Sequence, residues 1–315
     1  MRAFRLVGPG RLALVDMEPP VATSGEVIVR VLACGLCGTD VHIKQSGHYG
    51  WDGGAITLGH EILGEADGRR VVVEPQLFCR SCRFCLSGRP NVCENLKHLG
   101  IGCDGGFQER LAIPKANLHD APKVENWQAA LVEPVAGCVA ALKLAKIEDG
   151  MTLGIVGLGF FGQTIAQIAR MRGASKIIGV DPSERRRRLA EECGAISRSY
   201  APEDAIDRLA DVAIDAAGST TAPATALKLA EKAGTIVVFG YDRQPTTLNW
   251  YDILSKELTV VGCKSSAHAW PEALRLTPNL DLAPLVKTYP FERAEEAFAD
   301  MERGDVLKPV LMFDG

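Results

Sequence analysis

The sequence is poor in aromatic residues, lacks a long apolar run and carries little excess of either charge. Aromatic side chains make up 6% of the 315 residues, and 35 Lys and Arg residues face 39 Asp and Glu residues. A net charge of -4 provides no basic surface for nucleic acid or an acidic membrane. The longest near-apolar stretch, residues 151–162, is too short and too rich in glycine to span a bilayer. We therefore expect neither nucleic acid nor a membrane as a partner.

The N-terminus also lacks the apolar core and the cleavage site of a signal peptide. We therefore expect a cytoplasmic protein, in which cysteines stay reduced. The ten cysteines are then metal ligands or packing residues rather than disulfide partners. Five of them lie outside the metal-site motifs described below and are assigned to packing: Cys34, Cys103, Cys138, Cys193 and Cys263.

A change of pattern near Trp127 predicts two domains, which also suits the length of the chain. Before it lie short strands broken by glycine and proline, such as residues 26–32 and 70–75. After it we expect a helix at 129–146 and then alternating strands and helices, which predict a parallel, doubly wound sheet. The expected strands are 152–156, 176–180, 212–215, 235–239 and 258–261, and the helices between them end near 172, 193 and 232.

The end of the chain returns to a strand pattern, with one amphipathic helix at 292–303 and a last strand at 308–313. We expect this tail to rejoin the first domain. The fold class is therefore α/β, with a β-rich domain over residues 1–147, completed by 280–315, and a Rossmann-type doubly wound parallel sheet over 148–279.

A glycine-rich turn at residues 157–162 follows an expected strand and opens an expected helix. Gly157 permits the tight turn, Gly159 lets a pyrophosphate approach the backbone, and Gly162 allows close packing of helix and strand. The phosphates would lie at the helix N-terminus, beside Phe160 and Phe161. The alternative is a glycine-rich corner that binds no ligand.

Asp181 ends the next strand, about 20 residues beyond the glycine turn, where a carboxylate accepts hydrogen bonds from the adenosine ribose. A 2′-phosphate would meet like charge there, so NAD is favoured over NADP. Arg186 could flank the same ribose and keeps NADP open as the second choice. The arginine run at 185–188 is otherwise expected to be a solvated helix face.

Cys79, Cys82, Cys85 and Cys93 form a closely spaced set in a loop that also contains proline and glycine. Four thiolates can complete a tetrahedral shell around one zinc ion and leave no position for a substrate. This spacing predicts a structural zinc site. The alternatives are unliganded thiols or an iron-sulfur cluster.

A second possible metal set is dispersed along the chain and comprises Cys37, His60, Glu61 and Glu133. Sulfur, imidazole and carboxylate suit zinc, and a site with an exchangeable water position is catalytic. Composition alone does not bring such distant residues together. A Gly-His-Glu segment by itself is more often a turn than a pair of ligands.

Taken together, the motifs resemble those of the zinc-dependent medium-chain dehydrogenase/reductase family over nearly the full chain. The matching segments are residues 37–42, 59–61, 79–93, 133–134 and 157–162, together with Asp181. The resemblance implies a GroES-like catalytic domain, a Rossmann domain, two zinc ions per chain and a cleft between the domains. The chain is most similar to the branch of sorbitol and threonine dehydrogenases, because Glu133 stands where alcohol dehydrogenases have cysteine.

This resemblance implies that Cys37, His60 and Glu61 ligate a catalytic zinc, with Glu133 as an alternating or water-mediated ligand. Zinc would lower the pKa of the substrate hydroxyl, and hydride would pass to NAD. Thr39 would take the hydroxyl proton and pass it through the cofactor ribose to His42 and solvent. Without the resemblance, Thr39 is equally well a structural cap, and His42 a surface histidine.

We therefore expect oxidation of a secondary alcohol on a polyol, sugar or cyclitol. Threonine dehydrogenases carry a histidine before the cysteine loop, where this chain has Glu-Pro-Gln-Leu-Phe at 74–78. The alternatives are a threonine-type amino-alcohol dehydrogenase and a non-catalytic NAD-binding regulator. The intact set of Cys37, His60 and Glu61 disfavours the regulator, since a sensor needs no open zinc site.

Tyr49, Trp51 and Phe107 are candidates for the substrate pocket, with plain packing as the alternative for each. Residues 64–70 form a shorter connection than most relatives have. The shortening spares every proposed ligand but could reshape a subunit contact. We expect a homo-oligomer, either a dimer or a tetramer.

Overall fold

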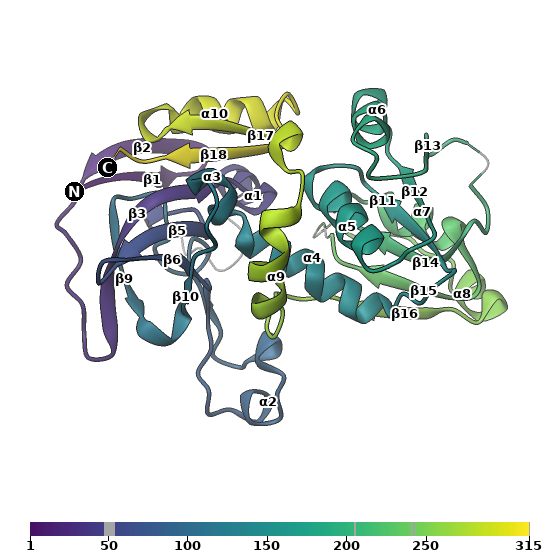
Figure 1. Cartoon of the computed structure of the whole chain (residues 1–315), viewed down its shortest axis with the longest axis horizontal. Coiled ribbons are helices and arrows are strands. Elements are labelled where there is room, and N and C mark those ends of the chain that lie inside the picture. The colour runs from purple at the N-terminus through teal and green to yellow at the C-terminus, as the bar shows by residue number, and fades with distance from the viewer. Residues whose placement is uncertain (47–53, 205, 241, 243, 315) are drawn as a thin grey trace. The chain divides into compact units, whose positions relative to one another are not determined.

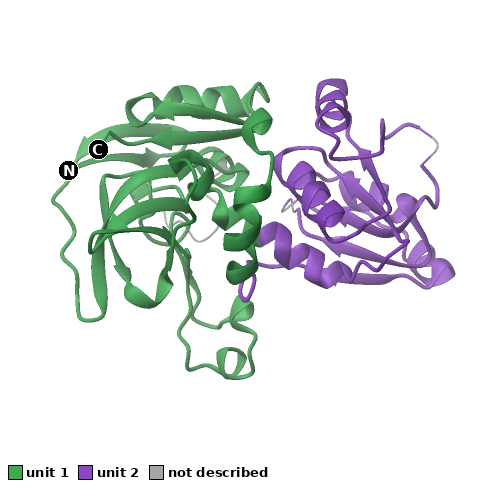
Figure 2. Ribbon diagram, viewed as in Figure 1, with its two compact units in different colours: residues 1–136, 270–315 green, residues 137–269 purple. Residues whose placement is uncertain are grey.

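The structure is a computed structural model that describes residues 1–46, 54–204, 206–240, 242 and 244–314 (Figure 1). It divides into two compact units, Met1–Ala136 with Trp270–Gly315 and Gly137–Ala269 (Figure 2). The division falls inside helix α4 (Val132–Ala145), so the domain limits at 147 and 279 remain predictions. None of the helices in the described residues has the length and apolar character that crossing a membrane requires.

The first unit is built mainly of strands. Its largest sheet has the order β10-β6-β5-β3-β18-β17, with β9 also paired to β3, and smaller sheets have the orders β2-β1-β4 and β7-β8. The strands are β1 (Arg2–Gly8), β2 (Arg11–Asp16), β3 (Glu26–Gly35), β4 (Ile56–Thr57), β5 (Glu61–Ala66), β6 (Arg69–Val73), β7 (Gln76–Leu77), β8 (Lys97–His98), β9 (Arg110–Pro114), β10 (Leu118–Asp120), β17 (Val286–Pro290) and β18 (Lys308–Met312).

The helices of this unit lie between its strands along the chain. They are α1 (Gly38–Ser46), α2 (Arg83–Leu86), α3 (Asn126–Ala130), the start of α4, α9 (Trp270–Leu276) and α10 (Ala294–Glu302). Short 3-10 turns lie at Pro90–Val92, Lys115–Asn117, Thr277–Asn279, Ala283–Leu285 and Phe291–Arg293.

Strand β3 is the centre of the large sheet. Its valines Val27, Val29 and Val31 alternate with less buried residues and face the core, as a half-buried strand requires. Near its end, β3 pairs antiparallel with β18, where Val310 lies opposite Gly35. The tail of the chain therefore completes the large sheet, beside which Cys37, a predicted site residue, follows β3.

The second unit is a parallel sheet with the strand order β13-β12-β11-β14-β15-β16. The first strand in sequence, β11, lies between β12 and β14, so the connections change direction there, which is where such sheets bind ligands. The strands are β11 (Thr152–Val156), β12 (Lys176–Val180), β13 (Arg198–Tyr200), β14 (Ala210–Asp215), β15 (Ala230–Val238) and β16 (Thr259–Gly262). The helices are α5 (Phe160–Met171), α6 (Glu184–Glu192), α7 (Ala222–Leu229) and α8 (Trp250–Lys256), besides most of α4.

Two helices differ from the sequence-based expectation. The single helix expected at 129–146 is two helices, because Leu131 leaves the helical conformation between α3 and α4. The helix expected to end near 232 ends at Leu229, and Ala230 is already extended at the start of β15. Its alanine-rich sequence has no glycine to mark that end, so the pattern could not locate it.

Candidate active site and metal centres

The four cysteines of the loop at 79–93 converge in the structure. One sulfur from each residue lies within 4.8 Å of the others. The Cys79 and Cys93 sulfurs are 3.4 Å apart, and the backbone N–H of Cys82 donates to the Cys79 sulfur at 3.3 Å. Such N–H groups stabilise thiolates, and a set of four suits a tetrahedral zinc ion with no open position. We name these residues the cysteine lobe.

The thiols of the lobe have unequal affinities for protons. Backbone hydrogen bonds from Ser81 and Cys82 lower the pKa of Cys79 to about 5. Desolvation and the neighbouring thiols raise the pKa of Cys85 to about 12. Four sulfurs this close cannot all ionise unless a cation compensates their charge, so the donor set fits a metal ion.

Cys37, His60 and Glu61 form a second set, and their potential ligand atoms also lie within 4.8 Å of one another. All three residues are buried. Cys37 follows β3, while His60 and Glu61 lie at the start of β5, which pairs with β3. The pairing of two neighbouring strands therefore brings together residues that are distant in sequence. We name this set the open cluster.

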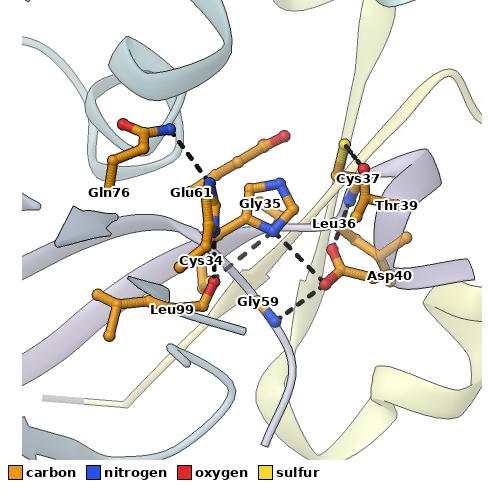
Figure 3. A network of polar contacts seen from close by, with 12 residues as sticks. Cys34, Gly35, Leu36, Cys37, Thr39, Asp40, Gly59, Glu61, Gln76 and Leu99 are labelled. Atoms are coloured by element: carbon orange, nitrogen blue, oxygen red, sulfur yellow. Dashed lines mark hydrogen bonds and ion pairs between the residues drawn. The ribbon is translucent and has the colours of Figure 1, made fainter. Parts of the chain in front are cut away.

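Asp40 connects the two loops that carry the open cluster (Figure 3). Its buried carboxylate accepts hydrogen bonds from the N–H groups of Cys37 at 2.9 Å and Gly59 at 3.0 Å. Gly59 has a φ of +88°, and a Cβ there would collide with the Phe107 ring, so only glycine permits this turn before His60. Burial is the largest single influence and lowers the pKa of His60, but the charges and hydrogen bonds of Asp40 and Cys37 together raise that pKa well above its ordinary value.

Lys308 provides a positive charge beside the cluster. Its ammonium group lies 2.6 Å from Oε1 of Glu61 and donates to the Leu36 carbonyl at 3.2 Å. Lys308 and Glu61 are 1% and 0% exposed. Burial opposes the charged lysine, but Glu61 and its neighbours raise the pKa of Lys308 above its ordinary value. In the sequence, a lysine at the start of the otherwise apolar last strand indicated a buried charge that needs a partner. The sequence could not show that this partner is Glu61.

The second oxygen of Glu61, Oε2, is buried without a hydrogen-bond partner among the described residues. Leaving a charged buried oxygen unpaired costs about 1–3 kcal/mol or more. A cation bound by Glu61, Cys37 and His60 would remove that cost, and thiolate, imidazole and carboxylate are ligands that zinc accepts. The open cluster therefore fits zinc, with three protein ligands rather than four.

Glu133 lies in the first turn of α4, outside this three-residue set but in electrostatic contact with it. Burial is the main cause that raises the pKa of Glu133 to about 7, and the charge of Glu61 adds to it. His60, Lys308 and a hydrogen bond from Gln76 act in the opposite direction.

The other candidates near this cluster have different surroundings. Thr39 is half-buried, with its hydroxyl 3.8 Å from the Cys37 sulfur, while His42 is exposed on α1. Phe107 is fully buried and packs edge-on against Phe298, so it is a core residue. Two further pocket candidates, Tyr49 and Trp51, lie outside the described residues.

The glycine turn of the second unit has the shape that a dinucleotide requires. Gly157 has a φ of +95°, and a Cβ there would lie 2.7 Å from the Ala217 backbone. A Cβ on Gly162 would collide with the Gly157 carbonyl, whereas one on Gly159 would meet nothing within 4 Å. Gly159 is the N-cap of α5 and provides no side chain to cap its N–H groups. The turn thus leaves open backbone at Gly159, at the N-terminus of α5, that fits a pyrophosphate.

Asp181 lies at the end of β12, beside this turn. Its carboxylate accepts hydrogen bonds from the N–H groups of Leu158 and Ser183, both at 2.8 Å. Arg186 lies 3.8 Å from the same carboxylate. Phe160 and Phe161 begin α5 with their rings edge to face, and Phe161 packs on Phe239. The structure therefore brings the candidate cofactor residues to one end of the sheet.

Two protein families match the chain. Residues 23–123 match the family described as "Alcohol dehydrogenase GroES-like domain", and residues 161–279 match the one described as "Zinc-binding dehydrogenase". The chain is 32% identical to an L-threonine 3-dehydrogenase of Streptomyces coelicolor, with 96% of each chain covered. It is 30% identical to the L-galactonate-5-dehydrogenase of Escherichia coli, with 97% of each covered.

Solved structures show the same architecture. A dehydrogenase from E. coli CFT073 (rspB), complexed with NADH, superposes with a TM-score of 0.91 at 26% identity and covers 99% of both chains. A zinc-binding dehydrogenase described as putative, from Sinorhizobium meliloti and bound to NADP, gives 0.90 at 27% identity, covering 99% of this chain and 98% of that one.

Proposed function

The chain belongs to the zinc-dependent medium-chain dehydrogenase family, whose members transfer hydride between an alcohol and a nicotinamide cofactor, and from this premise we propose its substrate, cofactor and ligands. The proposed reaction is oxidation of a secondary alcohol on a polyol, sugar or cyclitol, with NAD as the acceptor. The single observation that carries the proposal is the buried, unpartnered Oε2 of Glu61 beside Cys37 and His60.

Cys37, His60 and Glu61 are the proposed ligands of a catalytic zinc ion, with Glu133 as an exchanging ligand. When bound, zinc supplies a Lewis acid that lowers the pKa of the substrate hydroxyl. Asp40 holds the loops of Cys37 and His60 in place, and Lys308 offsets the charge of Glu61 through Oε1. Thr39 is proposed to accept the hydroxyl proton, and His42, on the exposed side of α1, to release it to solvent.

The cysteine lobe is the proposed site of a second zinc ion, which brings the count to two per chain. Its four sulfurs leave no ligand position for a substrate, so its role is to stabilise the loop at 79–93. The loop has little regular structure of its own, only α2 and one 3-10 turn. A metal ion is therefore the main constraint that would hold it.

NAD is the proposed cofactor, bound by Gly157, Gly159, Phe160, Phe161, Gly162, Asp181 and Arg186. Asp181 supports this choice because its carboxylate lies where a 2′-phosphate would meet negative charge. Arg186, 3.8 Å from it, favours NADP, as does the NADP bound to the relative from Sinorhizobium meliloti. Comparing kcat/KM for the two cofactors tests the choice.

The substrate proposal favours polyols over amino alcohols because this chain has Glu-Pro-Gln-Leu-Phe at 74–78, before the cysteine lobe, where threonine dehydrogenases carry a histidine. Threonine is the second candidate, since a threonine 3-dehydrogenase is among the relatives. Absorbance at 340 nm with NAD and a panel of polyols, sugar acids, cyclitols and amino alcohols tests both. Turnover of threonine alone would overturn the polyol proposal, and no turnover of any alcohol would favour a non-catalytic regulator.

A homo-oligomer, dimer or tetramer, is the proposed assembly. Strand β16 forms one edge of the parallel sheet, and exposed edge strands readily pair with another chain. Apolar side chains exposed on and near this edge support the proposal: Trp250, Tyr251, Leu254 and Val260. Light scattering should give a multiple of the 33.8 kDa chain mass, and Val260→Lys should shift the mass toward that of one chain.

A further inference from the structure

His98 lies beside the open cluster, although no motif of the sequence includes it. It ends β8, directly opposite Gln76 of β7 in the smallest sheet. Its ring meets the ring of His60 edge to face, with the centroids 5.4 Å apart. Gln76 itself is buried, at 2% exposure. Both side chains therefore belong to the immediate surroundings of the proposed catalytic metal.

The hydrogen bonds of His98 define where its proton lies. Its Nδ1 is 2.9 Å from the Leu99 carbonyl, and a carbonyl can only accept, so Nδ1 carries the hydrogen. In the neutral ring, Nε2 then presents a lone pair. That atom lies 3.1 Å from Nε2 of Gln76, so the amide nitrogen of Gln76 donates to it.

The amide of Gln76 has a second N–H, and the Gln76 side chain also acts on Glu133, where hydrogen bonding by Gln76 lowers the pKa of the carboxyl. A hydrogen bond lowers the pKa of a carboxyl only when it stabilises the ionised form, so Gln76 is the donor to the Glu133 carboxylate as well. With the amide reversed, its oxygen would face two acceptors, His98 Nε2 and the Glu133 carboxylate. His98 therefore selects the one orientation of Gln76 that can hold Glu133.

From this geometry we propose that His98 is a positioning residue for the exchanging zinc ligand. The Leu99 carbonyl orients His98, His98 orients Gln76, and Gln76 holds the Glu133 carboxylate toward the open cluster. Glu61 bears the same charge as Glu133 and would otherwise repel it from this position. The inference rests on the proposed function, in which Glu133 exchanges on the catalytic zinc.

The test variant removes the ring nitrogens of His98 and keeps an aromatic ring at this position. His98→Phe keeps an aromatic side chain against His60 but cannot accept from Gln76. Loss of such an outer contact typically weakens metal binding about 10- to 100-fold. We expect zinc at the open cluster to reach a chromogenic chelator at least about tenfold faster than in wild type, while release from the cysteine lobe is unchanged. The cobalt-substituted enzyme should also show a shifted visible spectrum.

Two further variants separate positioning from general damage. Gln76→Met retains length and burial without the amide and should reproduce the release rate and the spectrum of His98→Phe. His119→Phe is the control, because His119 is a half-buried histidine of the same unit that bonds to Glu74 and stacks on Trp270. It should leave zinc release at the open cluster unchanged.

A double-mutant cycle then identifies the residue through which His98 acts. In a Glu133→Ala background, His98→Phe should have no further effect on zinc release, because the group that it positions is gone. An equal effect in both backgrounds overturns the inference, as does wild-type release and spectrum in both single variants. If the wild-type chain itself binds no zinc at the open cluster, the proposed function fails instead.

Discussion

The cysteine lobe and the open cluster obtain their ligands in different ways. All four lobe cysteines come from one short loop, residues 79–93, and three of them are only half-buried. The open cluster combines Cys37, which follows β3, with His60 and Glu61 at the start of β5, and all three residues are buried. Glu133, in the first turn of α4, is in electrostatic contact with it. The open cluster also has charged partners, Asp40 and Lys308.

This difference indicates a difference in role. A set of four sulfurs would satisfy a zinc ion completely, so a metal bound there would only stabilise the loop. A set of three ligands with a fourth, exchanging carboxylate leaves a position for a substrate oxygen. Such a site must be held in place by the fold, because too few ligands come from any one segment. The following predictions test this division, from the largest expected effect to the smallest.

Removing an imidazole ligand from the open cluster should have the largest effect on turnover. His60→Ala should lower kcat at least about 1,000-fold, because metal polarisation contributes several kcal/mol and each 1.4 kcal/mol is about tenfold. Steady-state kinetics with NAD measure the loss. His119→Ala, in the same unit and outside the cluster, is the control. Comparable kcat in the two variants would contradict the assignment.

Removing a lobe cysteine should affect stability rather than chemistry. Cys82→Ser should lower the midpoint of thermal unfolding by on the order of 10 °C, because a structural zinc contributes folding free energy. The fraction that remains folded should turn over at near wild-type rate. Normal melting together with full zinc content would show that the lobe is not a zinc site.

Removing Lys308 should make the open cluster depend on its metal for stability. In Lys308→Met the buried Glu61 loses its positive partner, a change that typically costs about 3–5 kcal/mol. Bound zinc would offset part of that cost, so the fall in melting temperature should be larger after zinc is stripped than with zinc present. Lys44→Met, which breaks a more exposed pair with Glu302, serves as the control. Equal falls in melting temperature with and without zinc would show that the Lys308–Glu61 ion pair is not coupled to metal binding.

The smallest effect concerns the cofactor, in the other unit. Asp181→Ala should reduce the preference for NAD over NADP by about tenfold or more, because hydrogen bonds to charged groups contribute about 1.5–3 kcal/mol. The ratio of kcat/KM values measures it. The open cluster should be unaffected, so kcat with saturating NAD should change little. A wild-type enzyme that prefers NADP would contradict the proposal that Asp181 selects NAD.

The two metal sites also differ in how far the sequence could predict them. The lobe spacing and the glycine turn at 157–162 are local, because their residues are neighbours in sequence and in space. Cys37, His60 and Glu61 were linked only by resemblance, since their proximity depends on the pairing of β3 with β5.

The residues that support the open cluster were not predicted. Asp40 was noted only as part of a motif, and its contacts to two loops require the folded turn at Gly59. Lys308 reaches Glu61 because β18 pairs with β3, and no local pattern specifies that pairing. His98 and Gln76 lie on opposite sides of the cysteine lobe in sequence and meet only as β7 and β8. A local sequence pattern does not specify which distant strands pair, and these contacts depend on that pairing.

Cys37→Ser tests the division between the two sites most directly, when zinc content, turnover and NAD affinity are measured on the same preparation. The account predicts one zinc ion fewer per chain, no measurable turnover and an unchanged dissociation constant for NAD, because the lobe and the glycine turn are intact. Substantial turnover in this variant would contradict zinc-assisted hydride transfer at the open cluster, and so would retention of both zinc ions with wild-type kinetics.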